Sequence, residues 1–151
     1  MAYFPDGSLY EYDEMPFSLP SVRNIGWLSA VHAFPQGPTS TSFLESLKWC
    51  ACNCSTQQMR GTHTCEFCDL DRIEFECRGR RAWYGSAEIW VPTEGGYFAA
   101  PNLIVHYVEQ HQYSPPPAFV SAIISCCQGQ TPLQDIGKKI VDEAWKQRAD
   151  Q

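Results

Sequence analysis

The chain has 151 residues, of which 44% are hydrophobic and 13% aromatic, and it carries a net charge of −6. This composition is globular, and a chain of this length can bury a core of its own. An acidic chain is a poor ligand for polyanions, because phosphate contacts need clustered lysine and arginine. We therefore expect one domain over residues 1–151, with no nucleic-acid partner.

The N-terminal sequence MAYFPDG lacks the basic segment and the apolar run of a signal peptide. No stretch of the sequence is long enough to cross a bilayer. We expect a cytoplasmic protein with no membrane partner. Thiols stay reduced in that compartment, so the eight cysteines are expected to bind metal or to pack, before forming disulfides.

The first half of the chain predicts one strand and one helix. Residues 22–28 read as a strand, and the Pro-Gln-Gly-Pro sequence at 35–38 forces a turn. Ser42 and Glu45 match a capping box, in which Ser42 caps a short helix that runs to about Cys50.

Two β-rich segments follow. Residues 72–77 alternate between polar and apolar side chains, and residues 87–91 are rich in strand formers. We expect these two to pair antiparallel across the arginine-rich tip at 78–81, which is more typical of a hairpin turn than of a nucleic-acid site. A third short strand is expected at 97–99.

Three helices are expected in the remainder. One begins with Pro101 and runs to about His111, one begins after Ser114, and one follows a second capping box at Thr131. The last helix carries a clear apolar stripe. Together these elements predict an α+β fold, with a small antiparallel β-sheet and helices packed against it.

Two residue pairs have the spacing of zinc ligands. Cys65 and Cys68 form a Cys-x-x-Cys turn, and His106 and His111 form a His-x4-His pair. On an ideal helix, residues five apart point about 140° apart, so we expect His111 to lie where its helix ends. The cofactor predicted is Zn2+, which would tie sheet to helix as a structural site.

Other residues compete as ligands. His63 precedes Cys65 by two positions and can replace His111, while Cys52 or Cys54 can complete a site rich in thiolates with Cys65 and Cys68. Cys50 and Cys54 would share a face if the helix reached that far. Cys77 is expected in the core, and at least one residue of the Cys126–Cys127 pair is expected to pack.

Two motifs resemble those of a family of small, uncharacterised bacterial cytosolic proteins. They are RGTHTCEFC at residues 60–68 and APNLIVHYVEQHQYSPPPAF at residues 100–119. The resemblance spans about residues 22–125 and implies no established activity. It favours one metal-binding cluster over the cysteines at 50–54, namely His63, Cys65, Cys68, His106 and His111.

The motifs of common enzymes are missing from the sequence. It contains no His-x-Glu motif of zinc deaminases, no His-Glu-x-x-His, no Gly-x-Ser-x-Gly and no phosphate-binding loop. Four protein ligands would close the zinc shell, whereas catalytic zinc keeps an open position. The alternative is a zinc-dependent hydrolase with three protein ligands, in which Glu66 or Glu109 acts as the base.

By elimination we favour a module that binds another protein. The acidic charge suits a basic partner, for instance the toxin neutralised by an immunity-type inhibitor. Trp83, Tyr84 and Trp90 lie on or beside the expected hairpin and would be apt interface anchors if exposed, or core residues if not.

Overall fold

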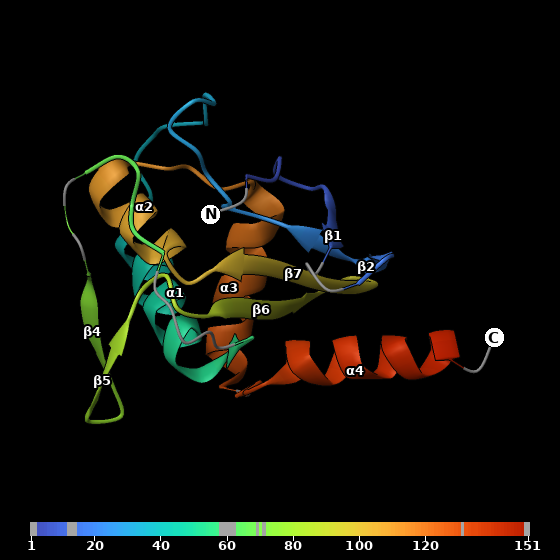
Figure 1. Cartoon of the computed structure of the whole chain (residues 1–151). Helices are drawn as coiled ribbons and strands as arrows, with labels where there is room; N and C mark the ends of the chain where they lie inside the picture. Colours follow the sequence, from blue (N-terminus) through green and yellow to red (C-terminus); the bar gives the residue numbers. More distant parts are fainter. Residues whose placement is uncertain are drawn as a thin grey trace.

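A five-stranded sheet lies at the centre of the molecule, with strand order β1-β2-β7-β6-β3 (Figure 1). The computed structural model describes residues 3–11, 15–57, 63–68, 70, 72–130 and 132–149. The strands are β1 (Leu9–Glu11), β2 (Ser18–Asn24), β3 (Ser55–Thr56), β6 (Glu88–Thr93) and β7 (Gly96–Pro101).

The predicted α+β fold is confirmed, and its sheet holds one parallel pair. β2 runs parallel to β7, while the β1–β2, β6–β7 and β3–β6 pairs are antiparallel. The expected strand at 97–99 is part of β7, and Gly95 precedes it with φ of 84°. β6 and β7 therefore form a hairpin within the sheet, with Trp90 opposite Ala99.

The expected pairing of residues 72–77 with residues 87–91 is wrong. β4 (Glu74–Cys77) pairs instead with β5 (Arg80–Trp83), in a separate two-stranded hairpin. Arg78 and Gly79 both have positive φ, at 54° and 77°. A two-residue turn with positive φ at both positions joins the two strands directly. Arg80 and Arg81 therefore belong to strand β5 and not to a longer hairpin tip.

The helices are α1 (Thr41–Asn53), α2 (Ile104–His111), α3 (Pro117–Gly129) and α4 (Ile136–Ala149). Side chains along β6 alternate between the two faces of the sheet, and each face contacts a different core. Ile89 and Val91 face a core shared with α1, α2 and α3, whereas Trp90 faces a second core that includes Val141 of α4. Among the described helices, none combines the length and apolarity that crossing a membrane requires.

Two helices begin at residues other than those expected. The cap of α1 is Ser40, whose side chain accepts a hydrogen bond from the Phe43 N–H at 3.0 Å, while Ser42 lies inside the helix. Pro101 is the last residue of β7, and α2 starts only at Ile104. Pro101 stays in the sheet because its register partner is Glu88 of β6. Thr131 lies outside the described residues, and α4 begins at Ile136.

Candidate metal centre

Four side chains from two separate segments converge at one point. The Cys65 Sγ lies 3.4 Å from the His111 Nε2, the Cys68 Sγ lies 3.3 Å from the His106 Nε2, and the two Nε2 atoms are 3.2 Å apart. All four ligand atoms lie within 4.8 Å of one another. This Cys₂His₂ group can hold a metal ion.

The spacing of the four atoms fits a tetrahedral shell. With Zn–S bonds of about 2.3 Å and Zn–N bonds of about 2.05 Å, tetrahedral geometry separates two nitrogens by about 3.3 Å and a sulfur from a nitrogen by about 3.6 Å. The observed separations of 3.2 to 3.4 Å are close to these values. The four atoms, all within 4.8 Å of one another, are therefore close enough together to bind a single divalent ion.

The cysteine pair is presented by a tight turn. The Phe67 N–H donates to the Cys65 Sγ at 3.3 Å, which fixes the turn around the sulfur. Burial raises the pKa of the Cys65 thiol to about 11, and the Phe67 N–H opposes that shift. A bound cation would stabilise the thiolate directly, because thiols that coordinate a metal lose their proton.

The histidine pair sits on α2, and His111 is the last residue of this helix. Gln112 follows in the left-handed conformation, with φ of 55°, and ends the helix as its C-cap. The end of the helix lets His111 turn toward His106, although the two are five residues apart. Burial, and then the neighbouring His111, lower the pKa of His106, so the neutral imidazole that binds metals is favoured.

Aromatic side chains hold the cysteine turn against α2. The Phe67 ring contacts His111, Tyr107 and Phe34, with ring centroids 5.4, 5.8 and 5.2 Å away. Tyr107 is fully buried, and the Phe34 ring also meets Tyr113. These contacts position Cys65 and Cys68 before any ion is bound.

His63 lies outside the group of four ligand atoms, although its backbone is anchored nearby. Its N–H donates to the Gly85 carbonyl at 3.0 Å. Gly85 has φ of 96°, and a Cβ at this position would lie 2.1 Å from the His63 carbonyl oxygen. The close approach of the two backbones therefore requires glycine at position 85, and it docks the segment that leads into the cysteine turn.

The two carboxylates considered as catalytic bases have other partners. Glu109 forms an ion pair with Lys48, at 2.7 Å between Nζ and Oε2, and the Glu66 Oε1 accepts a hydrogen bond from the Ala30 N–H at 3.2 Å. Each carboxylate therefore links two segments that lie beside the Cys₂His₂ group.

The profile of a family described as Domain of unknown function (DUF7919) matches residues 2–124. The chain belongs to the DUF7919 family. Neither a curated protein nor a solved structure matches the chain. The matched region contains all four residues of the Cys₂His₂ group, and it ends within α3.

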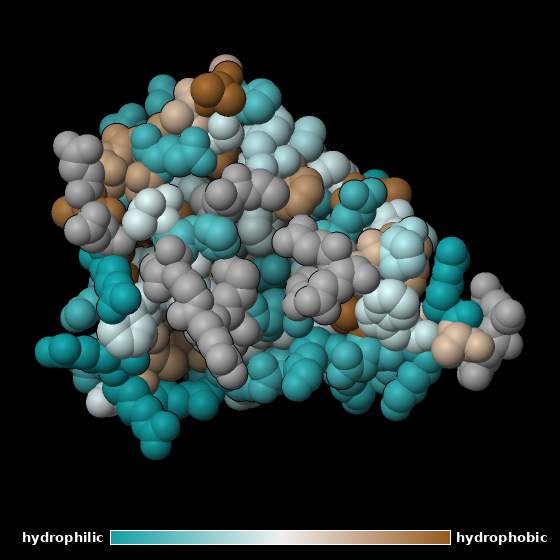
Figure 2. Space-filling view, viewed as in Figure 1, coloured by the Kyte–Doolittle hydropathy of each residue, from teal (hydrophilic) through white to brown (hydrophobic). Residues whose placement is uncertain are grey.

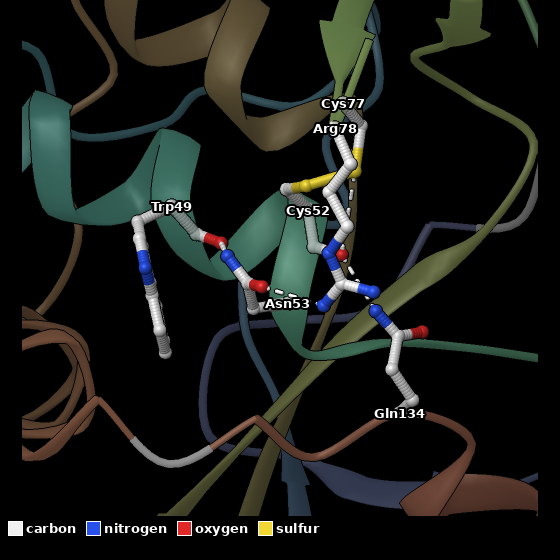
Figure 3. The surroundings of a disulfide bond; sticks show 6 residues. All are labelled: Trp49, Cys52, Asn53, Cys77, Arg78 and Gln134. Carbon is white, nitrogen blue, oxygen red and sulfur yellow. Dashed lines mark hydrogen bonds between the residues drawn. A yellow bond between two sulfur atoms is a disulfide. The ribbon is translucent and has the colours of Figure 1, made fainter. Parts of the chain in front are cut away.

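A disulfide joins Cys52 to Cys77, contrary to the expectation that the cysteines are reduced and that Cys77 lies in the core (Figure 3). It connects the end of α1 to the end of β4. Around it, the Arg78 Nη2 donates to the Asn53 Oδ1 at 2.7 Å, and the Gln134 Nε2 donates to the Cys52 carbonyl at 2.6 Å. Closing a loop of 25 residues contributes about 3.5 kcal/mol in the chain-entropy account.

Three further cysteines meet in the core. Cys50 and Cys54 come from the end of α1 and Cys126 from α3, with the Cys54 and Cys126 sulfurs 3.6 Å apart. The contacts with Cys50 and then with Cys54 lower the pKa of Cys126, and the contacts with Cys126 raise the pKa of Cys50 and Cys54. The alternative site of Cys52 or Cys54 with Cys65 and Cys68 is therefore wrong, because Cys52 is in a disulfide and Cys54 groups with Cys50 and Cys126.

The aromatic residues expected near the hairpin are mostly structural. Trp90 is fully buried, with its indole N–H donating to the Glu88 Oε1 at 2.9 Å, and Tyr84 is buried and stacked on Phe75. Trp83 is only half-buried, and the Arg72 guanidinium lies over its ring at 5.6 Å. Trp90 and Tyr84 are therefore core residues of the protein and not exposed interface anchors.

Proposed function

We propose that Cys65, Cys68, His106 and His111 bind one Zn2+ and that this zinc-stabilised domain is a module that binds another protein. The observation that carries the metal assignment is the convergence of four ligand atoms within 4.8 Å. Thiolate and imidazole together suit zinc better than Mg2+ or Ca2+, which prefer oxygen ligands. A shell of four protein ligands is typical of structural zinc.

The closed shell favours binding over hydrolysis. A catalytic zinc needs an open position for water and a carboxylate that can accept its proton. Here the four side chains suffice to fill a tetrahedral shell, and Glu66 and Glu109 already have other partners. The zinc would instead fix the cysteine turn and its neighbours as a rigid surface.

Two segments beside the zinc group present the surface that supports a binding role. Val31 is 85% exposed and Leu70 is 54% exposed, although both are large and apolar. The hydrogen bond from the Ala30 N–H to Glu66 links the segments that carry them. The face drawn in Figure 2 is mostly hydrophilic along α4, with strongly hydrophobic atoms projecting where the loop between β2 and α1 stands.

The partner best suited to this surface is a basic protein. A net charge of −6 attracts a basic partner over distance, while exposed apolar side chains supply contact area. An inhibitor of the immunity type, which neutralises a basic toxin, has these properties. The charge and the exposed side chains support this role, and the partner must be sought by experiment.

Metal analysis tests the zinc assignment. Protein purified without added metal should contain about one zinc per chain, and X-ray absorption at the zinc edge should show two sulfur and two histidine nitrogen neighbours. A shell with three protein ligands and one water would instead support the hydrolase alternative. Folded, monodisperse protein without metal would contradict the proposal.

Affinity capture tests the binding role. The tagged chain should retain a basic protein from its own cell, and Val31→Glu should weaken retention at least about 10-fold, because it places a charge in the apolar contact. The control is Leu9→Glu, since Leu9 is also large, apolar and exposed, at 37%, but lies in β1. Equal retention by wild type and Val31→Glu would argue against this surface.

A further inference from the structure

The three cysteines between α1 and α3 form a second cluster of soft ligands. Cys50 and Cys54 are one helical turn apart, and Cys126 reaches them from α3. The three sulfurs lie within 4.8 Å of one another, and the Cys54 and Cys126 sulfurs are 3.6 Å apart. This cluster shares no residue with the Cys₂His₂ group.

The spacing of the three sulfurs matches coordination of one ion. Three thiolates at about 2.3 Å from a common centre lie about 3.8 to 4.0 Å from one another. The Cys54 and Cys126 sulfurs are 3.6 Å apart, close to this range, and the Cys50 sulfur lies within 4.8 Å of both. Cys50 and Cys54 lie at the end of α1 and Cys126 lies on α3, which packs against α1, so the fold itself brings the three sulfurs together.

The donor set and its surroundings select a soft ion of low coordination number. Within the described residues, sulfur is the only donor type of this group, and its cysteines belong to a core built from residues such as Leu47 and Ile123. Zinc in structural sites takes four ligands, whereas soft thiolates also suit Cu(I), which is stable with three. Among the His, Cys, Asp and Glu side chains of the described residues, the group holds three ligands, one fewer than structural zinc uses.

An entry path leads to one of the three sulfurs. Cys50 and Cys54 are fully buried, but Cys126 is 8% exposed. A pocket of about 250 Å³ opens beside Cys126 and is lined by Pro92, Ala122, Ser125, Gly129 and Leu133. An ion can therefore bind Cys126 first and then Cys50 and Cys54, which lie deeper. The thiols release their protons to solvent or to a carrier on binding.

We propose that Cys50, Cys54 and Cys126 form a trigonal thiolate site for Cu(I). Binding forms three Cu–S bonds, releases the protons still held by the three thiols and needs no change in oxidation state. This inference does not depend on the zinc proposal, because the two sites use different residues.

The test is a competition for Cu(I) under anaerobic conditions, without thiol reductants, between the purified protein and a coloured Cu(I) chelator. Wild type should take one Cu(I) per chain while its zinc content stays constant. Cys126→Ala should bind at least about 100-fold more weakly, since even loss of an outer-shell partner costs 10- to 100-fold. Cys127→Ala is the matched control, because Cys127 is a free neighbouring cysteine outside the cluster, and it should behave as wild type.

Three further results bear on the assignment. Absorption at the copper edge should show sulfur neighbours alone, and Cys50→Ala and Cys54→Ala should each lose the site if Cys126→Ala fails to fold. Wild-type affinity in any folded variant of the three cysteines would overturn the proposal. So would release of one zinc for each copper bound, because that result would place copper on Cys65 and Cys68.

Discussion

Cys68→Ser should lose the bound zinc and lower the free energy of unfolding by at least about 3 kcal/mol, because metal that binds only the folded state adds its binding free energy to folding. His106→Ala should have the same effect. Cys68 and His106 come from segments 38 residues apart, so the loss would also release the cysteine turn from α2. Zinc analysis and urea unfolding of the purified variants measure both effects.

Two substitutions serve as controls for this result. His63→Ala should keep its zinc, since His63 lies outside the four-atom group, and Cys127→Ser should keep both zinc and stability. If His63→Ala lost the metal while His111→Ala retained it, the ligand set proposed above would be wrong. If Cys68→Ser kept a full equivalent of zinc, the metal would have to lie elsewhere.

Gly85→Ala should destabilise the protein by about 3 kcal/mol or more, through backbone strain and the loss of a buried hydrogen bond. The added Cβ would lie 2.1 Å from the His63 carbonyl oxygen, at a backbone φ of 96°. Because this carbonyl belongs to backbone, it cannot move aside without breaking the bond from the His63 N–H to the Gly85 carbonyl. Unfolding in urea measures the change in free energy, and zinc competition should show weaker metal binding.

Gly79→Ala separates close packing from backbone strain. Gly79 also has a positive φ, at 77°, but a Cβ there would meet no atom within 4 Å. This variant should lose only about 1 to 2 kcal/mol, the cost of the left-handed conformation for a residue with a side chain. Equal losses in the two variants would contradict the role assigned to the contact between Gly85 and His63.

The sequence alone predicted the candidate ligands, because their spacing is local. A Cys-x-x-Cys turn and a helical histidine pair are each set by a few neighbouring residues. The expectation that His111 lies at a helix end also followed from local geometry, and α2 ends at this residue. The choice between His63 and His111 did not follow, because it depends on how the segment before Cys65 docks on Gly85.

The strand pairing was decided by tertiary structure. Alternation at residues 72–77 and strand-forming residues at 87–91 indicated strands, but neither pattern carries information on strand partners. The positive φ of Arg78, a residue that rarely adopts this conformation, closes the β4–β5 hairpin early and leaves β6 free to pair with β7. Sequence patterns for turns favour asparagine or aspartate at that position, so the arginine gave no signal.

The cysteines show the same division most clearly. The spacing of the cysteines determined which of them could bind metal in a local turn. The periodicity of the apolar residues determined the α+β class. The Cys52–Cys77 disulfide and the cluster of Cys50, Cys54 and Cys126 join residues 25 and more than 70 positions apart. Such contacts arise only when α1 packs against α3 and the β4–β5 hairpin folds back on the end of α1, because side chains far apart in sequence meet through packing of whole elements and not through their own spacing.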